Sequence, residues 1–335
     1  MSQSPVKEVY PLGFPWKTQD PFLFCVYHRD LFPKGNDNLG PDPEQLKGRM
    51  IGQDFTIKDG WRMYHGQRVP GFPQHPHRGF ETITVVPEGL VDHSDSMGAT
   101  GRFGNGDVQW MTAGKGVLHS EMFPLVNPEK DNPLLLFQIW LNLPARSKFV
   151  EPHYKMLWSE DIPIHKTDDA EVTIVAGDFN ETKSLDTTPD SWASDPENGV
   201  AVWLIKIKEG GKLTLPTASN GVNRSVFFYE GDAVSVGDLT LDVQQGVDIH
   251  ADQSVTLGGG EKEAHLLLLQ GKPIGEPVVQ QGPFVMNTQE EIYDTIREYQ
   301  RTQFGGWPWP QDEFVHPSDK GRFALHADGN EEIKG

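Results

Sequence analysis

The interpretation of this chain starts from one stretch, Gly71-Phe72-Pro73-Gln74-His75-Pro76-His77-Arg78-Gly79-Phe80-Glu81-Thr82. Its two histidines flank a proline, which disfavours helix, so both lie on extended chain, where residues i and i+2 point to the same face. A second motif, His119-Ser120-Glu121, repeats this spacing. Two such strands side by side would direct three imidazoles and one carboxylate to one point. The two motifs therefore predict a metal site formed by His75, His77, His119 and Glu121.

Short runs rich in Val, Ile, Thr and aromatic residues surround these motifs and alternate with Gly and Asp turn signals. The runs predict strands at 22–27, 81–86, 90–94, 108–112, 117–122 and 134–143. Strands at such regular spacing are typical of an all-β sandwich or barrel. A second strand-rich stretch, 200–270, shows the same pattern of short strands and turns, and we interpret it as a second copy of the fold. It follows a polar connection that ends in a loop at 187–199.

The length of 335 residues favours two domains, which we place at 1–145 and 146–335. Within the first domain, the polar, Gly- and Pro-punctuated segment 29–66 is interpreted as an irregular surface insertion. Near the C-terminus, Thr288-Gln289-Glu290-Glu291 is a capping-box pattern and predicts a helix over 289–303. The Trp307-Pro308-Trp309-Pro310 tail is expected to be extended, with its tryptophans packed on the body of the protein.

Composition excludes several classes of function. The formal net charge of −19 argues against nucleic-acid binding and favours basic protein partners. The single cysteine, Cys25, excludes an intramolecular disulfide and thiolate-rich metal sites, and it suits a reducing compartment. We find no signal-peptide pattern and no apolar run of bilayer length, so a cytoplasmic protein without membrane contact is expected.

The remaining histidines carry weaker signals. His28 and His93 have Asp30 and Asp95 two residues on, but no second histidine, and are interpreted as hydrogen-bonded or solvated edges. In the second half, His250 with Asp252 and His265 with Glu263 show the same weak spacing, and no metal is expected there. Cys25 lies in an apolar strand and is interpreted as core.

Two long motifs resemble the pirin family of the cupin superfamily. They are the stretch 71–82 quoted above and Gly106-Asp107-Val108-Gln109-Trp110-Met111-Thr112-Ala113-Gly114-Lys115-Gly116-Val117-Leu118-His119-Ser120-Glu121-Met122. Gln281-Gly282-Pro283-Phe284-Val285-Met286-Asn287-Thr288 is also similar to pirins. The resemblance covers most of the chain, although the long 29–66 segment departs from the family pattern.

The resemblance implies two cupin (jelly-roll type) β-barrels packed face to face, with metal in the N-terminal barrel only and a short C-terminal helix. In the family, the positions matching His75, His77, His119 and Glu121 bind iron. Glu81 falls where other cupins often place a ligand, so we expect Glu81 and Arg78 to support the ligands from behind.

Three imidazoles and a carboxylate suit Fe(II), and also Mn, Co, Ni, Cu or Zn. By resemblance, the chain would be a quercetin 2,3-dioxygenase-type enzyme acting on a small aromatic or enolic substrate with O2, with Glu121 as metal ligand and catalytic base. Two alternatives remain open. The protein would be a metal- and redox-responsive partner of a regulatory protein, or its metal would only stabilise the barrel.

Overall fold

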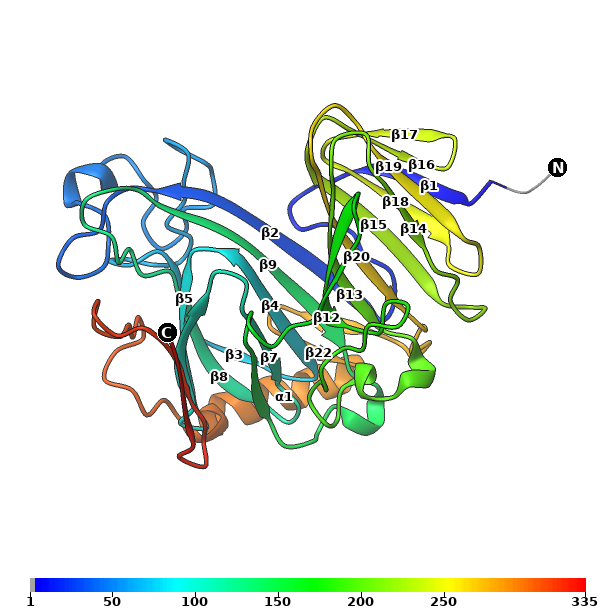
Figure 1. Cartoon of the computed structure of the whole chain (residues 1–335). Helices are drawn as coiled ribbons and strands as arrows, with labels where there is room; N and C mark the ends of the chain where they lie inside the picture. Colours follow the sequence, from blue (N-terminus) through cyan, green and yellow to red (C-terminus); the bar gives the residue numbers. More distant parts are fainter. Residues whose placement is uncertain (1–3) are drawn as a thin grey trace. The chain divides into compact units, whose positions relative to one another are not determined.

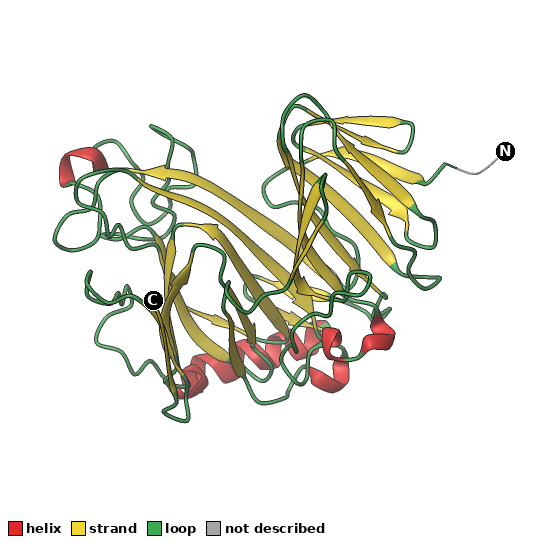
Figure 2. Ribbon diagram, viewed as in Figure 1, coloured by secondary structure: helices red, strands yellow, loops and turns green. Residues whose placement is uncertain are grey.

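The computed structural model describes residues 4–335, and most of its elements are β-strands (Figures 1 and 2). This confirms the predicted all-β class with one short C-terminal helix. Among the residues described, no helix is long and apolar enough to cross a membrane. The chain forms two compact units. We call residues 27–138, 145–159 and 276–335 the histidine unit, and residues up to 26, 139–144 and 160–275 the second unit.

The strands of the histidine unit are β3 (Gly71–His77), β4 (Phe80–Glu88), β5 (Leu90–Asp95), β6 (Thr100–Gly104), β7 (Val108–Thr112), β8 (Val117–Met122), β10 (His153–Leu157), β21 (Val279–Gln281), β22 (Phe284–Met286), β23 (Arg322–Leu325) and β24 (Glu331–Lys334). Strand β2 (Phe22–Phe32) belongs to it from residue 27, and β9 (Asn132–Asn142) up to residue 138. Its main sheets have the orders β10-β7-β4-β9-β2 and β24-β23-β6-β5-β8-β3. Strands β4 and β8 are buried along nearly their whole length, although they carry Glu81, His119 and Glu121 among their apolar residues.

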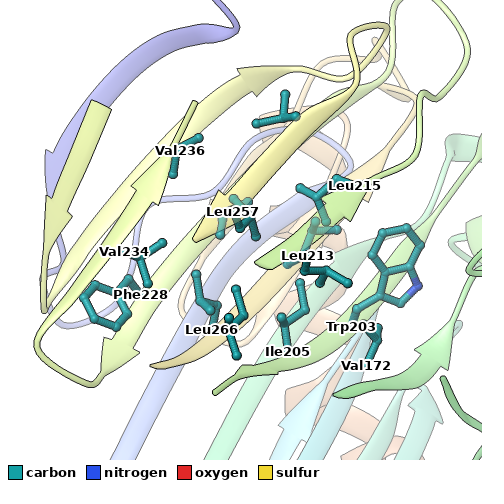
Figure 3. Close-up of a cluster of buried hydrophobic side chains, with 14 of the residues drawn as sticks. Val172, Trp203, Ile205, Leu213, Leu215, Phe228, Val234, Val236, Leu257 and Leu266 are labelled. Carbon is teal, nitrogen blue, oxygen red and sulfur yellow. The ribbon is translucent and has the colours of Figure 1, made fainter. Parts of the chain in front are cut away.

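The strands of the second unit are β1 (Val6–Pro11), β11 (Ile164–Lys166), β12 (Ala170–Ala176), β13 (Ala201–Ile207), β14 (Lys212–Leu215), β15 (Asn223–Glu230), β16 (Ala233–Val236), β17 (Leu239–Asp242), β18 (Gln245–His250), β19 (Val255–Gly259) and β20 (Ala264–Gly271). They form sheets of order β1-β18-β15-β20-β13-β12-β11 and β14-β19-β16-β17. Alternate residues of these strands meet in an apolar core that includes Trp203, Ile205, Phe228 and Leu266 (Figure 3). The predicted loop at 187–199 contains two short 3-10 turns, η3 (Trp192–Ser194) and η4 (Pro196–Asn198).

The helix α1 (Gln289–Thr302) begins at the predicted capping box. Thr288 Oγ1 accepts from the backbone N–H of Glu291, and the Glu291 carboxylate accepts from the backbone N–H of Thr288. Its buried residue Ile292 packs with Phe284 and Met286 of β22 (Figure 1, orange). The helix therefore belongs to the histidine unit, and the compact units differ from a linear division at residue 145, because the chain from residue 276 onward folds onto its N-terminal half.

The segment 29–66 differs in two places from the expected irregular surface chain. Strand β2 continues through it as far as Phe32, and Trp61, Met63 and Tyr64 are buried in the core of the histidine unit. Between them lie loops and one 3-10 turn, η1 (Pro43–Leu46). The buried residues follow a polar stretch without strand periodicity, so the sequence pattern alone did not mark them.

The C-terminal tail is attached to the histidine unit. The prediction was that the tryptophans of this tail pack on the body of the protein, and Trp309 does so. Arg102 on β6 forms two hydrogen bonds to the Asp92 carboxylate and donates to the carbonyl oxygens of His316, Pro317 and Lys320. The Trp309 indole N–H donates to the Asp95 carbonyl oxygen at 2.8 Å. The remaining short turns are η2 (Ala145–Ser147) and η5 (Gln303–Gly305).

Candidate metal centre

The two histidine motifs lie on neighbouring antiparallel strands at one edge of the six-stranded sheet. In the register of β3 and β8, His75 is paired with His119, and His77 with Val117. Because side chains alternate along a strand, His75 and His77 share a face, and pairing brings His119 to the same face. The arrangement that the sequence predicted for the three histidines is therefore present in the fold.

The three imidazoles converge through their Nε2 atoms. His75 Nε2 lies 3.1 Å from His77 Nε2 and 3.0 Å from His119 Nε2. Two ligands at right angles, each about 2.1 Å from a metal ion, lie about 3.0 Å apart. His75 Nδ1 lies 2.8 Å from the Pro73 carbonyl oxygen, to which it can only donate, so the lone pair of Nε2 faces the cluster. The donor set and its spacing thus fit a metal ion held by His75, His77 and His119.

Burial keeps these histidines neutral. Desolvation lowers the pKa of His75 to about 4, against a smaller opposite effect of its hydrogen bond to Pro73. The pKa values of His77 and His119 also fall well below the usual value, first through desolvation and then through the neighbouring histidines. Neutral imidazole is the form that binds a metal ion, so the site is prepared for one at neutral pH.

Glu121 lies beside the three histidines rather than among them. One of its oxygens, Oε2, is 3.8 Å from His119 Nε2. The same oxygen accepts from the amide of Gln138, and Oε1 accepts from the Thr84 hydroxyl at 2.9 Å. Burial raises the pKa of the Glu121 carboxyl, while these two donors oppose the shift. The carboxylate is therefore held in a fixed orientation next to the cluster.

Glu81 and Arg78, the two residues expected to support the ligands, are held by the following contacts. Oε1 of the buried Glu81 accepts from the Thr112 hydroxyl at 2.6 Å and the Trp110 indole at 3.2 Å. Arg78 extends toward helix α1, where it donates to Glu298 at 2.8 Å and lies over the ring of Phe304. The structure thus places Arg78 at the anchor of the C-terminal helix.

The sequence interpretation missed the partners of Glu121. It predicted His93 as a hydrogen-bonded or solvated edge, and His93 is hydrogen-bonded but buried. Thr84 is one of several threonines in β4, and nothing in its spacing marks it. His93 is fully buried and is paired in register with Glu121 across β5 and β8. Its Nε2 lies 3.2 Å from Asp95 Oδ2, and its ring stacks on Tyr154. The two-residue spacing of His93 and Asp95 was the signal in the sequence. It places both side chains on one face of β5, and strand pairing makes this the face that carries Glu121 and His119.

In the second unit, His265 Nε2 lies 2.9 Å from Glu263 Oε1. Across residues 4–335, the only group of three or more ligand-type side chains close enough to hold a metal ion is the one formed by His75, His77 and His119.

Comparison with known proteins gives consistent results. The chain matches the family model described as Pirin over residues 44–141, and the one described as Pirin C-terminal cupin domain over residues 202–305. It is 36% identical to human pirin, covering 72% of this chain and 80% of that protein, and 38% identical to pirin-1 of Arabidopsis thaliana, covering 70% and 78%.

Two further relatives carry the name of an enzyme. A Pseudomonas aeruginosa protein named as a candidate quercetin 2,3-dioxygenase is 34% identical, with 78% of this chain and 87% of that protein covered. The crystal structure of a quercetin 2,3-dioxygenase from Acinetobacter baumannii superposes with a TM-score of 0.70 at 28% identity, covering 91% of this chain and 98% of that one.

Proposed function

Since the chain belongs to the pirin family, we propose that it is a metal-dependent dioxygenase of the quercetin 2,3-dioxygenase type. The observation that carries the proposal is the spacing of 3.0–3.1 Å from His75 Nε2 to the other two Nε2 atoms. The enzyme names of the Pseudomonas and Acinetobacter relatives support it. Fe(II) is the metal we propose. His75, His77 and His119 would hold it, and Glu121, whose Oε2 lies 3.8 Å from His119 Nε2, would be the fourth ligand.

A bound metal ion would supply Lewis-acid chemistry and open positions for an enolic oxygen and O2. The chain's own residues would do the rest. Glu121 Oε2 would accept the proton of the substrate hydroxyl, because its carboxylate faces the cluster and its raised pKa brings it closer to that of the hydroxyl. Thr84 and Gln138 would keep the carboxylate in this orientation through their hydrogen bonds.

The test combines metal analysis with turnover. Protein purified without added metal is analysed for its metal content, then stripped and reloaded with Fe(II), Mn, Co, Ni, Cu or Zn in separate samples. Loss of quercetin absorbance should accompany uptake of one O2 per quercetin in the iron-loaded sample. His119→Ala protein treated in the same way is the control. Iron-replete protein that consumes neither quercetin nor O2 would sink the proposal.

A second candidate function is a metal-responsive protein partner without turnover. The net charge of −19 favours it, because such a surface attracts basic partners. Pull-down experiments with Fe(II)- and Fe(III)-loaded protein address it directly. Partner capture that differs between the two oxidation states, from a protein inactive on quercetin, would favour this function over the enzyme.

A further inference from the structure

A continuous series of rings leads from the surface of the histidine unit to the candidate metal centre. Phe55 lies at its outer end, with its ring centroid 4.9 Å from that of His65 and 6.5 Å from that of Phe72. Phe72 in turn lies 5.8 Å from His65 and 6.3 Å from His75. The inner end of the series is thus a proposed metal ligand, and the outer end is a phenylalanine that is 38% exposed.

The position of Phe72 follows from an irregularity in β3. Residues three apart on a regular strand point to opposite faces, so Phe72 and His75 would be separated. The register of β3 and β8 shifts between these two residues, which marks a bulge. As a result, the Phe72 ring reaches His75, and Phe72 is paired across the strands with Glu121.

Contacts outside the series hold these rings in place, namely hydrogen bonds for His65 and ring contacts with Tyr64 for the two phenylalanines. His65 Nδ1 donates to the Gly52 carbonyl oxygen at 2.8 Å, and the His65 backbone N–H donates to Gly71 at 3.1 Å. Tyr64, which is fully buried, contacts both Phe55 and Phe72 through its ring. Phe55 thus keeps part of its apolar ring exposed to solvent, next to rings that reach the candidate metal centre.

We propose that Phe55, His65 and Phe72 form an aromatic wall that holds the planar ring system of an aromatic substrate while its enolic oxygen reaches the metal centre. This rests on the proposed dioxygenase function, and it assigns the recognition of the substrate's remote ring to the 29–66 segment and the start of β3. A flat aromatic ligand suits the wall because stacked and edge-to-face contacts with its rings add to the apolar area buried.

His65 gives the wall a polar position. Its Nδ1 donates to the Gly52 carbonyl oxygen, so the Nε2 of the neutral ring is an acceptor, and the residue is exposed. A hydroxyl on the remote ring of the substrate would donate to Nε2. The wall would therefore prefer hydroxylated flavonols such as quercetin over 3-hydroxyflavone, which has the metal-binding enol but no other hydroxyl.

The test is a binding titration on protein loaded with Ni(II) in the absence of O2, followed by steady-state kinetics on iron-loaded protein. Phe55→Ala should weaken quercetin binding by about 3- to 10-fold. It should raise KM more than it lowers kcat, since the wall binds ground state and transition state alike. Ile57→Ala is the matched control, because Ile57 is an apolar residue of the same segment, 59% exposed, outside the ring series. Metal content and azide binding should be unchanged in both variants.

His65→Ala should reduce the preference for quercetin over 3-hydroxyflavone while leaving metal content intact. Unchanged quercetin affinity in Phe55→Ala, or an equal loss in Ile57→Ala, would overturn the wall even if the enzyme turns over quercetin. Conversely, protein that binds quercetin in a Phe55-dependent manner but never consumes O2 would support the wall and overturn the proposed function. The two failures are thus distinguishable.

Discussion

The Nε2 atoms of His75 and His119 lie 3.0 Å apart, although the two residues are 44 positions apart in the chain. The two Nε2 atoms could not lie so close together if both carried a hydrogen. The hydrogen of His75 is on Nδ1, which donates to the Pro73 carbonyl oxygen. His75 Nε2 is therefore an acceptor, and strand pairing has placed it beside two more imidazole nitrogens inside the protein. A metal ion between the three rings would be bound by the lone pairs of all three, in the neutral form of imidazole that binds metals.

Removing one histidine should abolish metal binding. His119→Ala leaves two imidazoles and one carboxylate, and the remaining ligands no longer surround the ion. We expect the metal content per chain to drop to background, as measured by inductively coupled plasma mass spectrometry. His153→Ala, at an exposed position of β10, is the control and should retain metal. Retention of a full equivalent of metal by His119→Ala would contradict the assignment.

A substitution at Glu121 should distinguish metal binding from turnover. Glu121→Gln keeps the shape of the side chain but removes the charge and the proton acceptor. If Glu121 is the base, turnover should fall by roughly 10²- to 10⁴-fold. Quercetin consumption by metal-matched samples measures this. Full activity at equal metal loading would remove Glu121 from the proposed mechanism.

The orientation of Glu121 should matter as well as its charge. Thr84→Val is nearly isosteric and removes the hydroxyl that donates to Oε1. Residues that orient a metal ligand typically contribute about 10- to 100-fold to metal affinity or activity. Competition with a chromophoric chelator measures the affinity. Thr214→Val, on an exposed strand position of the second unit, should have no effect.

The metal-free protein should lose stability in acid. The pKa of His75 is lowered to about 4 in the folded state, and those of His77 and His119 also lie well below the usual value, so the unfolded chain binds more protons below pH 6.5. Their contribution is present above pH 6.5 and is lost as the pH falls toward 4. Between pH 7.5 and 5.5 each histidine should cost about 1 kcal/mol of unfolding free energy. Urea denaturation at the two pH values tests this, and higher stability at pH 5.5 would contradict it.

Arg78 should be important for stability rather than for metal binding. Its guanidinium is buried, donates to the Lys115 carbonyl oxygen and Glu298, and lies over Phe304. Arg78→Ala should lower the free energy of unfolding by about 2–4 kcal/mol. Glu298→Gln should cost less than about 1 kcal/mol, because the Glu298 side chain is 43% exposed. If folded Arg78→Ala protein loses its metal, then Arg78 supports the metal ligands, as the sequence predicted.

Local patterns in the sequence determined the all-β class, the helix and the face shared by His75 and His77. The reason is that these features depend on neighbours: strand side chains alternate with a period of two, and a capping box needs only four residues. The capping box at Thr288 and Glu291 is present, and α1 ends one residue before the predicted boundary.

Tertiary structure alone decided which distant residues meet. The bulge between Phe72 and His75, the hydrogen bond from Thr84 to Glu121, and the burial of Trp61 and Tyr64 all depend on pairing and packing between segments far apart in the chain. The sequence by itself thus determined which side chains could bind a metal ion. Only the fold decided what holds them in place and which rings stand beside them, because register and packing are properties of contacts that no single stretch contains.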